Sequence, residues 1–340
     1  MAIQESKGIL SHAVEDKFLR IDGGNGASFF FPVGTYADWK RGLEFYRAVS
    51  RRAKAKKALL KFAYPVLKRR ACLTAAEVAQ VIAAELGMTE LPKLDGHSPA
   101  MISPTRDKAL VHHIGRSFEK FASKNSLPGV TGELELYRRL AEWQPRSFSY
   151  SRLLDFSAGA SIVRFEMAYA SGEFRDAPPE LPELLEPLVE FFSLPGTATR
   201  SWVELWESLA IGVELPAEYR NGETPVGLVH RDFKPWNVKS GLKPLFFDFE
   251  SAAMDGCPLE DLFNYYVEPR LPAFRADKLV GAVRRKVFPL AETLLRRLSI
   301  SAEEVNRYWH WYLLERVSFW RTQGQIAHAL LFESLYEHSR

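Results

Sequence analysis

The stretch that most constrains the fold lies about two thirds of the way along the chain, where a polar loop is set between two apolar runs. From residue 226 it reads VGLVHRDFKPWNVKSGLKPLFFDFE. The apolar runs predict strands, and the second run ends in Asp248. This stretch holds the densest cluster of potentially catalytic side chains in the sequence, so the chain has to build strands that hold the loop in place.

The sequence on either side of this stretch divides into a β-rich part and a helical part. From about residue 99, short runs such as ALVHHIG and SFEKFAS predict antiparallel strands, followed by a helix in GELELYRRLAEW and another strand pair. Beyond Gly172 the periodicity becomes helical up to the C-terminus. We therefore predict an α+β chain with a small antiparallel β lobe, residues 96–170, and a larger, mainly helical lobe, residues 171–340.

Residues 1–95 are predicted to form an N-terminal extension. The segment KFLRIDGGNGASFFFPVG indicates a hairpin, because two β-prone runs flank a cluster of Gly and Asn. The GGNG cluster lacks the spacing of a phosphate-binding loop, so its glycines are interpreted as turn residues. Further on, Thr74, Glu77 and Gly87 predict a helix that begins with a capping box and ends at a glycine.

A basic stretch, residues 51–70, follows the hairpin and holds nine Lys or Arg and no acid. Apolar residues recur in it at helical spacing, and Pro65 is expected to kink the helix. A basic amphipathic helix can rest on an anionic membrane, where each basic side chain contributes on the order of 1 kcal/mol. The alternative interpretation, a solvated helix packed on the domain, is favoured over membrane contact.

Composition limits the remaining classes of function. The 340 residues are 46% hydrophobic and 13% aromatic, enough for a sizeable core, and the net charge of +3 is too small to suggest nucleic acid as the main partner. The two cysteines, Cys72 and Cys257, have no spacing typical of a zinc site or a disulfide framework. We predict a cytoplasmic protein with no signal peptide and no membrane span.

Three polar residues around the loop match the needs of phosphoryl transfer from ATP. The reaction needs a carboxylate that orients the acceptor hydroxyl, and oxygen ligands that hold Mg²⁺ against the phosphates. Asp232 and Asn237 are five residues apart on one loop, and Asp248 follows a buried strand. They supply these three parts.

The order of residues resembles the aminoglycoside phosphotransferase and choline kinase branch of the protein-kinase-like fold. The resemblance rests on HxDxxxxN, an apolar strand, DFE and then GCPLEDL at residues 256–262. It implies a bilobal fold in which His230 braces the loop, Asp232 is the catalytic base, and Asn237 and Asp248 bind Mg²⁺. Asp261 is expected to anchor the loop.

The same resemblance implies a strand lysine for the α- and β-phosphates of ATP and a helix glutamate paired with it. Lys120 and Glu133 fit this order best, with Lys124 and Glu135 as the competing choices. Adenine is expected to bind near Met167 and Tyr169. In place of a glycine-rich loop, the segment SPTRDKA offers the hydroxyls of Ser103 and Thr105 to cover the phosphates.

Two residues of the loop depart from the small-molecule branch. Trp236 stands where that branch often has glycine, and Lys234 stands where protein kinases place a lysine that contacts the transferred phosphate. A protein kinase is still disfavoured, because the sequence has no GxGxxG before Lys120, no DFG and no APE segment.

The predicted activity is an ATP- and Mg²⁺-dependent phosphotransferase acting on a hydroxyl of a small molecule, with a sugar or a precursor of polysaccharide or lipopolysaccharide as the preferred acceptor. Aminoglycoside or choline kinase activity is the alternative, and a kinase-like pseudoenzyme that binds nucleotide or a partner is the alternative of another class. The basic stretch at residues 51–70 suggests work near the inner membrane surface. The candidates for lining the acceptor site are acidic and aromatic residues of the helical lobe: Glu204, Trp206, Glu207, Glu260, Trp309 and Trp311.

Overall fold

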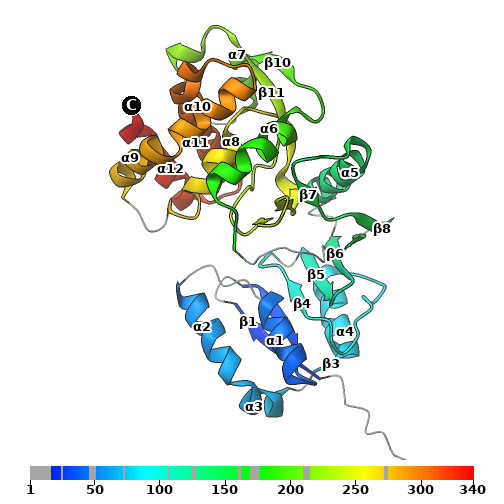
Figure 1. Cartoon of the computed structure of the whole chain (residues 1–340). Helices are drawn as coiled ribbons and strands as arrows, with labels where there is room; N and C mark the ends of the chain where they lie inside the picture. The colour runs from blue at the N-terminus through cyan, green and yellow to red at the C-terminus, as the bar shows by residue number, and fades with distance from the viewer. Residues whose placement is uncertain are drawn as a thin grey trace, which may run out of the picture. The chain divides into compact units, whose positions relative to one another are not determined.

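The computed structural model divides the chain into two compact units, each described by itself (Figure 1). Unit 1 comprises residues up to Pro128 together with Leu153–Tyr169, and unit 2 comprises Gly129–Arg152 together with Ala170–Arg340. The structure describes residues 17–23, 26–45, 51–71, 73–105, 107–123, 127–159, 162–168, 177–209, 215–271 and 275–340. Both α-helices and antiparallel strands are present, so the predicted α+β class is confirmed.

Unit 1 is built on an eight-stranded sheet with the order β3-β1-β2-β4-β5-β6-β9-β8. The described strand pairs in this sheet are antiparallel. Its strands are β1 (Lys17–Asp22), β2 (Ser28–Pro32), β3 (Leu73–Thr74), β4 (Ala100–Ile102), β5 (Lys108–His113), β6 (Ser117–Ser123), β8 (Leu153–Ala158) and β9 (Ile162–Ala168).

The predicted hairpin forms part of this sheet. Strand β2 pairs with β4, with Phe29 opposite Met101, so residues 17–32 continue the sheet that was predicted to begin near residue 96. The physical reason is the apolar run in β2, whose five residues are all buried. A strand that is apolar on both faces cannot stand at a solvated edge, and it needs a neighbouring strand and cover on each side.

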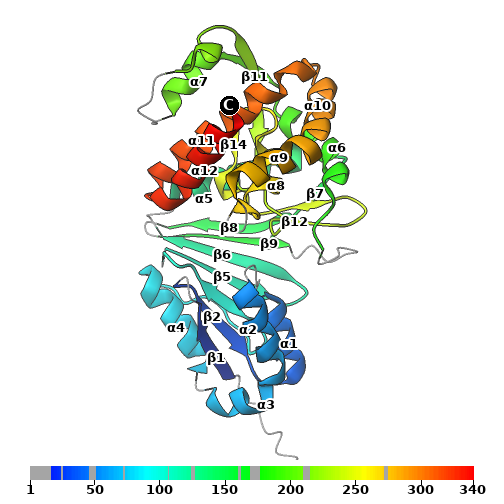
Figure 2. The same cartoon turned by 90° about the vertical axis from the view of Figure 1, so that its left-hand side faces the viewer.

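Helices cover both faces of the β1–β2 hairpin (Figure 2). Helix α4 (Ala75–Leu86) packs with Phe18 and Phe30 on one face, whereas Trp39 of α1 (Tyr36–Phe45) packs with Phe29 and Phe31 on the other. Alternation of side chains along β2 explains this division. Helix α4 has the predicted capping box and ends at Gly87 in the left-handed conformation, so this prediction is confirmed.

The basic stretch forms two helices joined at the predicted break. Helix α2 (Arg51–Phe62) ends before Pro65, and α3 (Tyr64–Leu67) begins with this proline in its first turn. Leu60 and Tyr64 pack against the core of unit 1, while Leu59, Phe62 and Val66 are 72%, 83% and 61% exposed. Apolar side chains thus lie on two sides of this segment.

Unit 2 is mainly helical around short strands (Figure 1). Its helices are α5 (Leu127–Trp143, from Gly129 onward in this unit), α6 (Leu185–Ser193), α7 (Trp202–Ser208), α8 (Glu260–Val267), α9 (Ala276–Lys286), α10 (Phe288–Arg297), α11 (Val305–Thr322) and α12 (Ile326–Ser339). Its strands form two three-stranded sheets, β10-β11-β14 and β12-β13-β7. They are β7 (Ser149–Tyr150), β10 (Ala198–Ser201), β11 (Glu223–Val229), β12 (Val238–Lys239), β13 (Leu245–Phe246) and β14 (Ala253–Gly256). No helix among the described residues is long and apolar enough to cross a membrane.

Two glycines allow β11 and β14 to fit closely into unit 2. Gly227 and Gly256 are opposite each other in the two strands. A Cβ on Gly227 would lie 2.3 Å from the Phe192 carbonyl oxygen, and a Cβ on Gly256 would lie 2.0 Å from Cγ2 of Val229. Since Val229 directly precedes His230, this packing sets where the polar loop begins.

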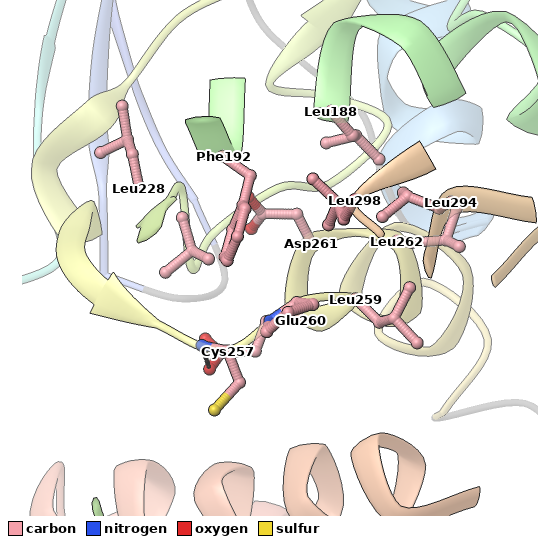
Figure 3. Close-up of a pocket in the computed structure, with 12 residues that line it drawn as sticks. Leu188, Phe192, Leu228, Cys257, Leu259, Glu260, Asp261, Leu262, Leu294 and Leu298 are labelled. Carbon is pink, nitrogen blue, oxygen red and sulfur yellow. Dashed lines mark hydrogen bonds between the residues drawn. The ribbon is translucent and has the colours of Figure 1, made fainter. Parts of the chain in front are cut away.

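A pocket lies in the core behind the polar loop, where the ends of β11 and β14 meet α8 and α10 (Figure 3). Its lining is mostly apolar, with Leu188, Phe192, Leu228 and Leu294 among the contributing residues. Asp261 and Glu260 also contribute to it, and both are buried. The apolar lining identifies this pocket as a packing feature of the core beneath the loop.

Candidate active site

The polar loop leaves β11 through a tight, strained turn at Arg231. The amide of Asp232 donates a 2.7 Å hydrogen bond to the carbonyl of His230, and φ of Arg231 is 60°. A three-residue turn with positive φ at its centre has the form of the rarer γ-turn. Asp261 stabilises it by accepting hydrogen bonds from the His230 and Arg231 amides, at 2.7 and 2.9 Å, which matches the anchoring role expected for Asp261.

Asp232 lies between two partners from its own loop. Its Oδ1 is 2.6 Å from Nζ of Lys234, and its Oδ2 accepts a 2.7 Å hydrogen bond from Nδ2 of Asn237. The same Nδ2 donates to the Asp232 carbonyl at 2.9 Å, so Oδ1 of Asn237 is the amide atom that could coordinate a cation. The carboxylate is partly exposed, with 32% of its side chain accessible, as a base that meets a substrate must be.

His230 connects the loop to the segment that carries Asp248. The imidazole is completely buried, and its Nε2 lies 3.0 Å from the carbonyl oxygen of Phe247. A carbonyl only accepts, so Nε2 carries the proton and donates. The amide of Phe247 in turn donates to the Asn237 carbonyl at 3.3 Å. His230 therefore links the start of the loop to the residue before Asp248.

Asp248 lies in a cluster of three carboxylates. It has a φ of 67°, and one oxygen each of Glu133, Asp248 and Glu250 lie within 4.8 Å of one another. Helix α5 packs on this segment along one face: a Cβ on Gly129 would lie 3.2 Å from Cγ of Glu250, and the Tyr137 ring is 5.3 Å from that of Phe249. Three oxygen donors at this spacing suit a hard divalent cation. Glu250 was not among the predicted ligands.

The two glutamates that the sequence offered as alternatives, Glu133 and Glu135, differ in burial. Glu133 is 1% exposed and belongs to the carboxylate cluster. Glu135, two residues further along α5, faces solvent and pairs with Arg139 at 3.0 Å. Burial thus favours Glu133 as the functional residue. The competing lysine, Lys124, lies outside the described residues.

Unit 1 carries the other residues expected to bind nucleotide. Lys120 lies in the middle of β6, is 8% exposed, and has its Nζ 5.8 Å from the Phe165 ring centroid. Its neighbour Glu119 points to the other face of the sheet, where it contacts His113 and Arg164. Met167 is a buried residue near the end of β9. Tyr169 lies outside the described residues.

Ser103 and Thr105 lie in the turn that joins β4 to β5. Both hydroxyls donate to Oδ1 of Asp107, and the Ser103 hydroxyl also accepts from the Lys108 amide at 3.2 Å. Although burial opposes it, these hydrogen bonds lower the pKa of Asp107. Both hydroxyls are thus hydrogen-bonded to a carboxylate of the same turn.

Lys234 is enclosed by aromatic rings and a second carboxylate. Its Nζ is 5.8 Å from the ring centroid of Trp236 and 5.7 Å from that of Trp320, which lies in the last turn of α11. Glu268 lies 4.0 Å away, and only 12% of the lysine side chain is exposed. Two indoles therefore flank the lysine beside the candidate base. Trp320 was not predicted, since it is far from the loop in sequence.

Several residues expected to line the acceptor site belong to the core instead. Trp309 and Trp311 are 0% and 2% exposed, and their positions in α11 pack them into the aromatic core of unit 2. Glu260 is 4% exposed and accepts a 2.6 Å hydrogen bond from the Cys257 amide. Trp206 remains partly exposed, and Glu204 and Glu207 are exposed. A helical pattern alone could not distinguish buried from cleft-lining tryptophans.

Buried charges surround the base of the loop. Burial and the neighbouring Glu315 carboxylate raise the pKa of Glu260 to about 8. Burial opposes ionisation of Glu315 too, but the guanidinium of Arg316 lowers its pKa overall. Arg231 lies in the same cluster, with its Nε 3.9 Å from Glu260. These groups form a buried charge cluster beside the turn at Arg231.

The model of the family described as the phosphotransferase enzyme family matches residues 15–287. This is well over half of the chain and includes the loop, the carboxylate cluster and Lys120. The chain belongs to the phosphotransferase enzyme family. Membership explains why the loop and DFE segment of this phosphotransferase resemble those of small-molecule kinases. The match also begins within the predicted extension, in agreement with the sheet that joins the hairpin to β4.

Two solved structures of aminoglycoside phosphotransferases are similar to this phosphotransferase. A thermostable mutant of aminoglycoside phosphotransferase APH(4)-Ia, in complex with ADP and hygromycin B, is 15% identical, with 77% of this chain and 98% of that chain covered and a TM-score of 0.42. The complex of APH(2")-IIa with streptomycin and ATP is 15% identical, with 77% and 99% covered and a TM-score of 0.39. A search of curated proteins gave no match. Both TM-scores are below 0.5, so family membership rests on the family model.

Residues 288–340 of this phosphotransferase lie outside the match, but two of them contact the polar loop. Trp320 comes from this segment, and so does Arg316, whose Nη1 donates to the Arg231 carbonyl at 3.1 Å. Neither had a sequence signal, because their partners in the loop are more than 80 residues away.

Proposed function

We propose that the chain is an ATP- and Mg²⁺-dependent kinase that phosphorylates a hydroxyl of a small molecule. The observation that carries the proposal is the arrangement of Asp232 between Lys234 and Asn237, with Oδ1 2.6 Å from Nζ of the lysine. Asp232 accepts the proton of the acceptor hydroxyl while the hydroxyl oxygen bonds to the γ-phosphorus of ATP. The bond between the γ-phosphorus and the bridging oxygen breaks, and ADP leaves with its electrons. Lys234 stabilises negative charge on the transferred phosphoryl group.

The residues that would hold Mg²⁺ are Asn237 and Asp248, with Glu250 as an additional candidate. Their oxygen atoms are the donors that this hard cation prefers, and the carboxylates of Asp248, Glu250 and Glu133 lie within 4.8 Å of one another. When bound, the ion would neutralise charge on the phosphates. Lys120 of β6 is the candidate for the α- and β-phosphates, and the backbone near Met167 for adenine.

The acceptor we propose is a sugar or a sugar-containing precursor of polysaccharide or lipopolysaccharide. Trp236 and Trp320 support it, because both rings lie beside Lys234 and an indole stacks well on the apolar face of a sugar ring. A cationic acceptor such as an aminoglycoside or choline would rely more on acidic side chains. Among the candidates for such a role, Glu204 and Glu207 are exposed, but Glu204 already caps α7 by bonding to the Ser201 amide.

The experiment that tests the acceptor is a transfer assay with γ-labelled ATP and a panel of sugars, nucleotide sugars, aminoglycosides and choline. Labelling of a sugar with the highest kcat/KM in the panel is the expected result. Preference for an aminoglycoside or choline would overturn the acceptor assignment and leave the kinase activity intact. Mg²⁺-dependent ATP binding without transfer to any acceptor would favour the pseudoenzyme alternative.

We also propose that residues 51–70 bring this cytoplasmic enzyme to the anionic inner surface of a membrane. Leu59, Phe62 and Val66 support contact with a bilayer, since they are 72%, 83% and 61% exposed on a segment with nine basic residues and no acid. Such side chains can insert at the interface while each basic residue contributes on the order of 1 kcal/mol.

Cosedimentation with vesicles tests the membrane proposal. Binding to vesicles of phosphatidylcholine with phosphatidylglycerol should exceed binding to phosphatidylcholine alone, and the variant F62S/V66S should lose most of it. Leu242→Ser is the matched control, because Leu242 is 93% exposed in unit 2. Equal binding of wild type and F62S/V66S, or binding that ignores the anionic lipid, would refute the proposal.

A further inference from the structure

The peptide between Arg231 and Asp232 is held at both of its polar groups. Its N–H donates to the His230 carbonyl at 2.7 Å, and its carbonyl oxygen accepts from Nδ2 of Asn264 at 2.9 Å and from Nη1 of Arg316 at 3.1 Å. Asp261 holds the two preceding amides, those of His230 and Arg231. A non-glycine residue at positive φ is strained and persists only where its surroundings fix it. The contacts to this carbonyl are therefore part of what keeps the turn in place.

Arg316 is itself fixed before it reaches the loop. Its Nε and Nη2 donate to the two carboxylate oxygens of Glu315 at 2.6 and 2.8 Å, and its guanidinium carbon is 4.5 Å from the Phe319 ring centroid. Arg316 and Glu315 are 2% and 5% exposed. The planar fork of donors leaves Nη1 pointing at the Arg231 carbonyl, a geometry that lysine cannot reproduce.

We propose that Arg316 is a positioning residue for the catalytic base, acting through the Arg231 carbonyl. The inference rests on the proposed function of Asp232. The next backbone nitrogen after this carbonyl belongs to Asp232 and donates to the His230 carbonyl at 2.7 Å. A rotation of the Arg231 carbonyl therefore turns the Asp232 backbone and displaces its carboxylate relative to Lys234 and Asn237.

This assignment gives the C-terminal helices a role in the reaction. Arg316 and Glu315 both belong to α11, which lies beyond residue 287, where the match to the family ends. Asn264 of α8 lies within the match and supplies the other donor. The Arg231 carbonyl thus accepts one hydrogen bond from a residue inside the family match, Asn264, and one from a residue beyond it, Arg316.

Two variants test the role of Arg316 with different risks to folding. R316K keeps a positive charge beside Glu315 but loses the fork, and E315L/R316M removes the buried pair together, so that neither charge is left unpaired. For both we expect kcat to fall on the order of 10-fold to 100-fold, with the KM and the dissociation constant for ATP unchanged. R321M is the matched control on the same helix, because Arg321 pairs with Glu333 at the surface; it should keep the wild-type kcat.

Amide hydrogen exchange supplies a readout besides activity. In both variants the amides of His230, Arg231 and Asp232 should exchange faster, while those of β11 remain protected as in wild type. Wild-type kcat and wild-type exchange in R316K and E315L/R316M would overturn the inference. Uniformly faster exchange across unit 2 would also overturn it, since it would assign Arg316 to general stability. An inactive wild-type chain would instead refute the proposed function.

Discussion

Replacing Gly256 by alanine should strain the strand that leads into the catalytic loop. The new Cβ would lie 2.0, 2.6 and 2.8 Å from Cγ2, Cγ1 and Cβ of Val229, which is 2% exposed in β11. Overpacking of a core costs about 1–3 kcal/mol, and three contacts this short place G256A at the upper end or beyond it. At roughly 2–4 °C per kcal/mol, the melting temperature of unit 2 should fall by about 6–12 °C.

The assay is thermal unfolding followed by circular dichroism, together with kcat. Gly281→Ala is the control with the opposite sign, because Gly281 lies within α9 and its Cβ would meet only the end of the Arg285 side chain, at 3.3 Å. Alanine at such a site stabilises by roughly 0.5–1 kcal/mol. In a V229A background, G256A should cost less, since two of the three contacts disappear. A melting temperature of G256A equal to that of wild type would refute the reasoning.

Three further predictions concern the site. Burial raises the pKa of Glu260 from 4.5 to about 8, so the stabilisation that its protonated form provides is present below pH 4.5 and is lost as pH rises through 8. The free energy of unfolding of E260Q in urea should therefore depend less on pH between 5 and 8 than that of wild type. Identical pH profiles of the two proteins would contradict this. W236A and W320A should each raise the KM of the acceptor about 3-fold to 10-fold with an unchanged KM for ATP. A change in the KM for ATP alone would contradict the stacking role of the two indoles. D248N should need roughly 10-fold more Mg²⁺ for half-maximal turnover, whereas an unchanged Mg²⁺ titration would exclude Asp248 as a ligand.

The polar residues of the loop could be selected from the sequence because they lie close together in it. Asp232, Lys234 and Asn237 lie within six residues, and the structure brings them into direct contact. The helix at Thr74 was predictable for the same reason, since a capping box is formed by residues three apart. Where neighbours in sequence are also neighbours in space, residue types and spacing were sufficient.

Features that depend on distant packing could not be predicted. The β1–β2 hairpin was assigned to an extension because its pairing with β4 joins segments about 70 residues apart. Trp309 and Trp320 belong to one helix, yet the first is completely buried and the second flanks Lys234. Helical periodicity marks both as apolar and gives no indication of which neighbour each will meet. Arg316 escaped notice for the same reason.

The central claim is that Asp232 serves as the base for phosphoryl transfer from ATP, and one comparison tests it most directly. Transfer of label from γ-labelled ATP to the acceptor is measured for wild type and D232N, with Mg²⁺ and with EDTA, and with E135Q as a control for an exposed carboxylate on α5. The account predicts Mg²⁺-dependent transfer by wild type and E135Q, and a loss on the order of 100-fold or more in D232N, whose ATP affinity stays unchanged. Equal transfer by D232N and wild type, or no Mg²⁺-dependent transfer by wild type, would contradict it.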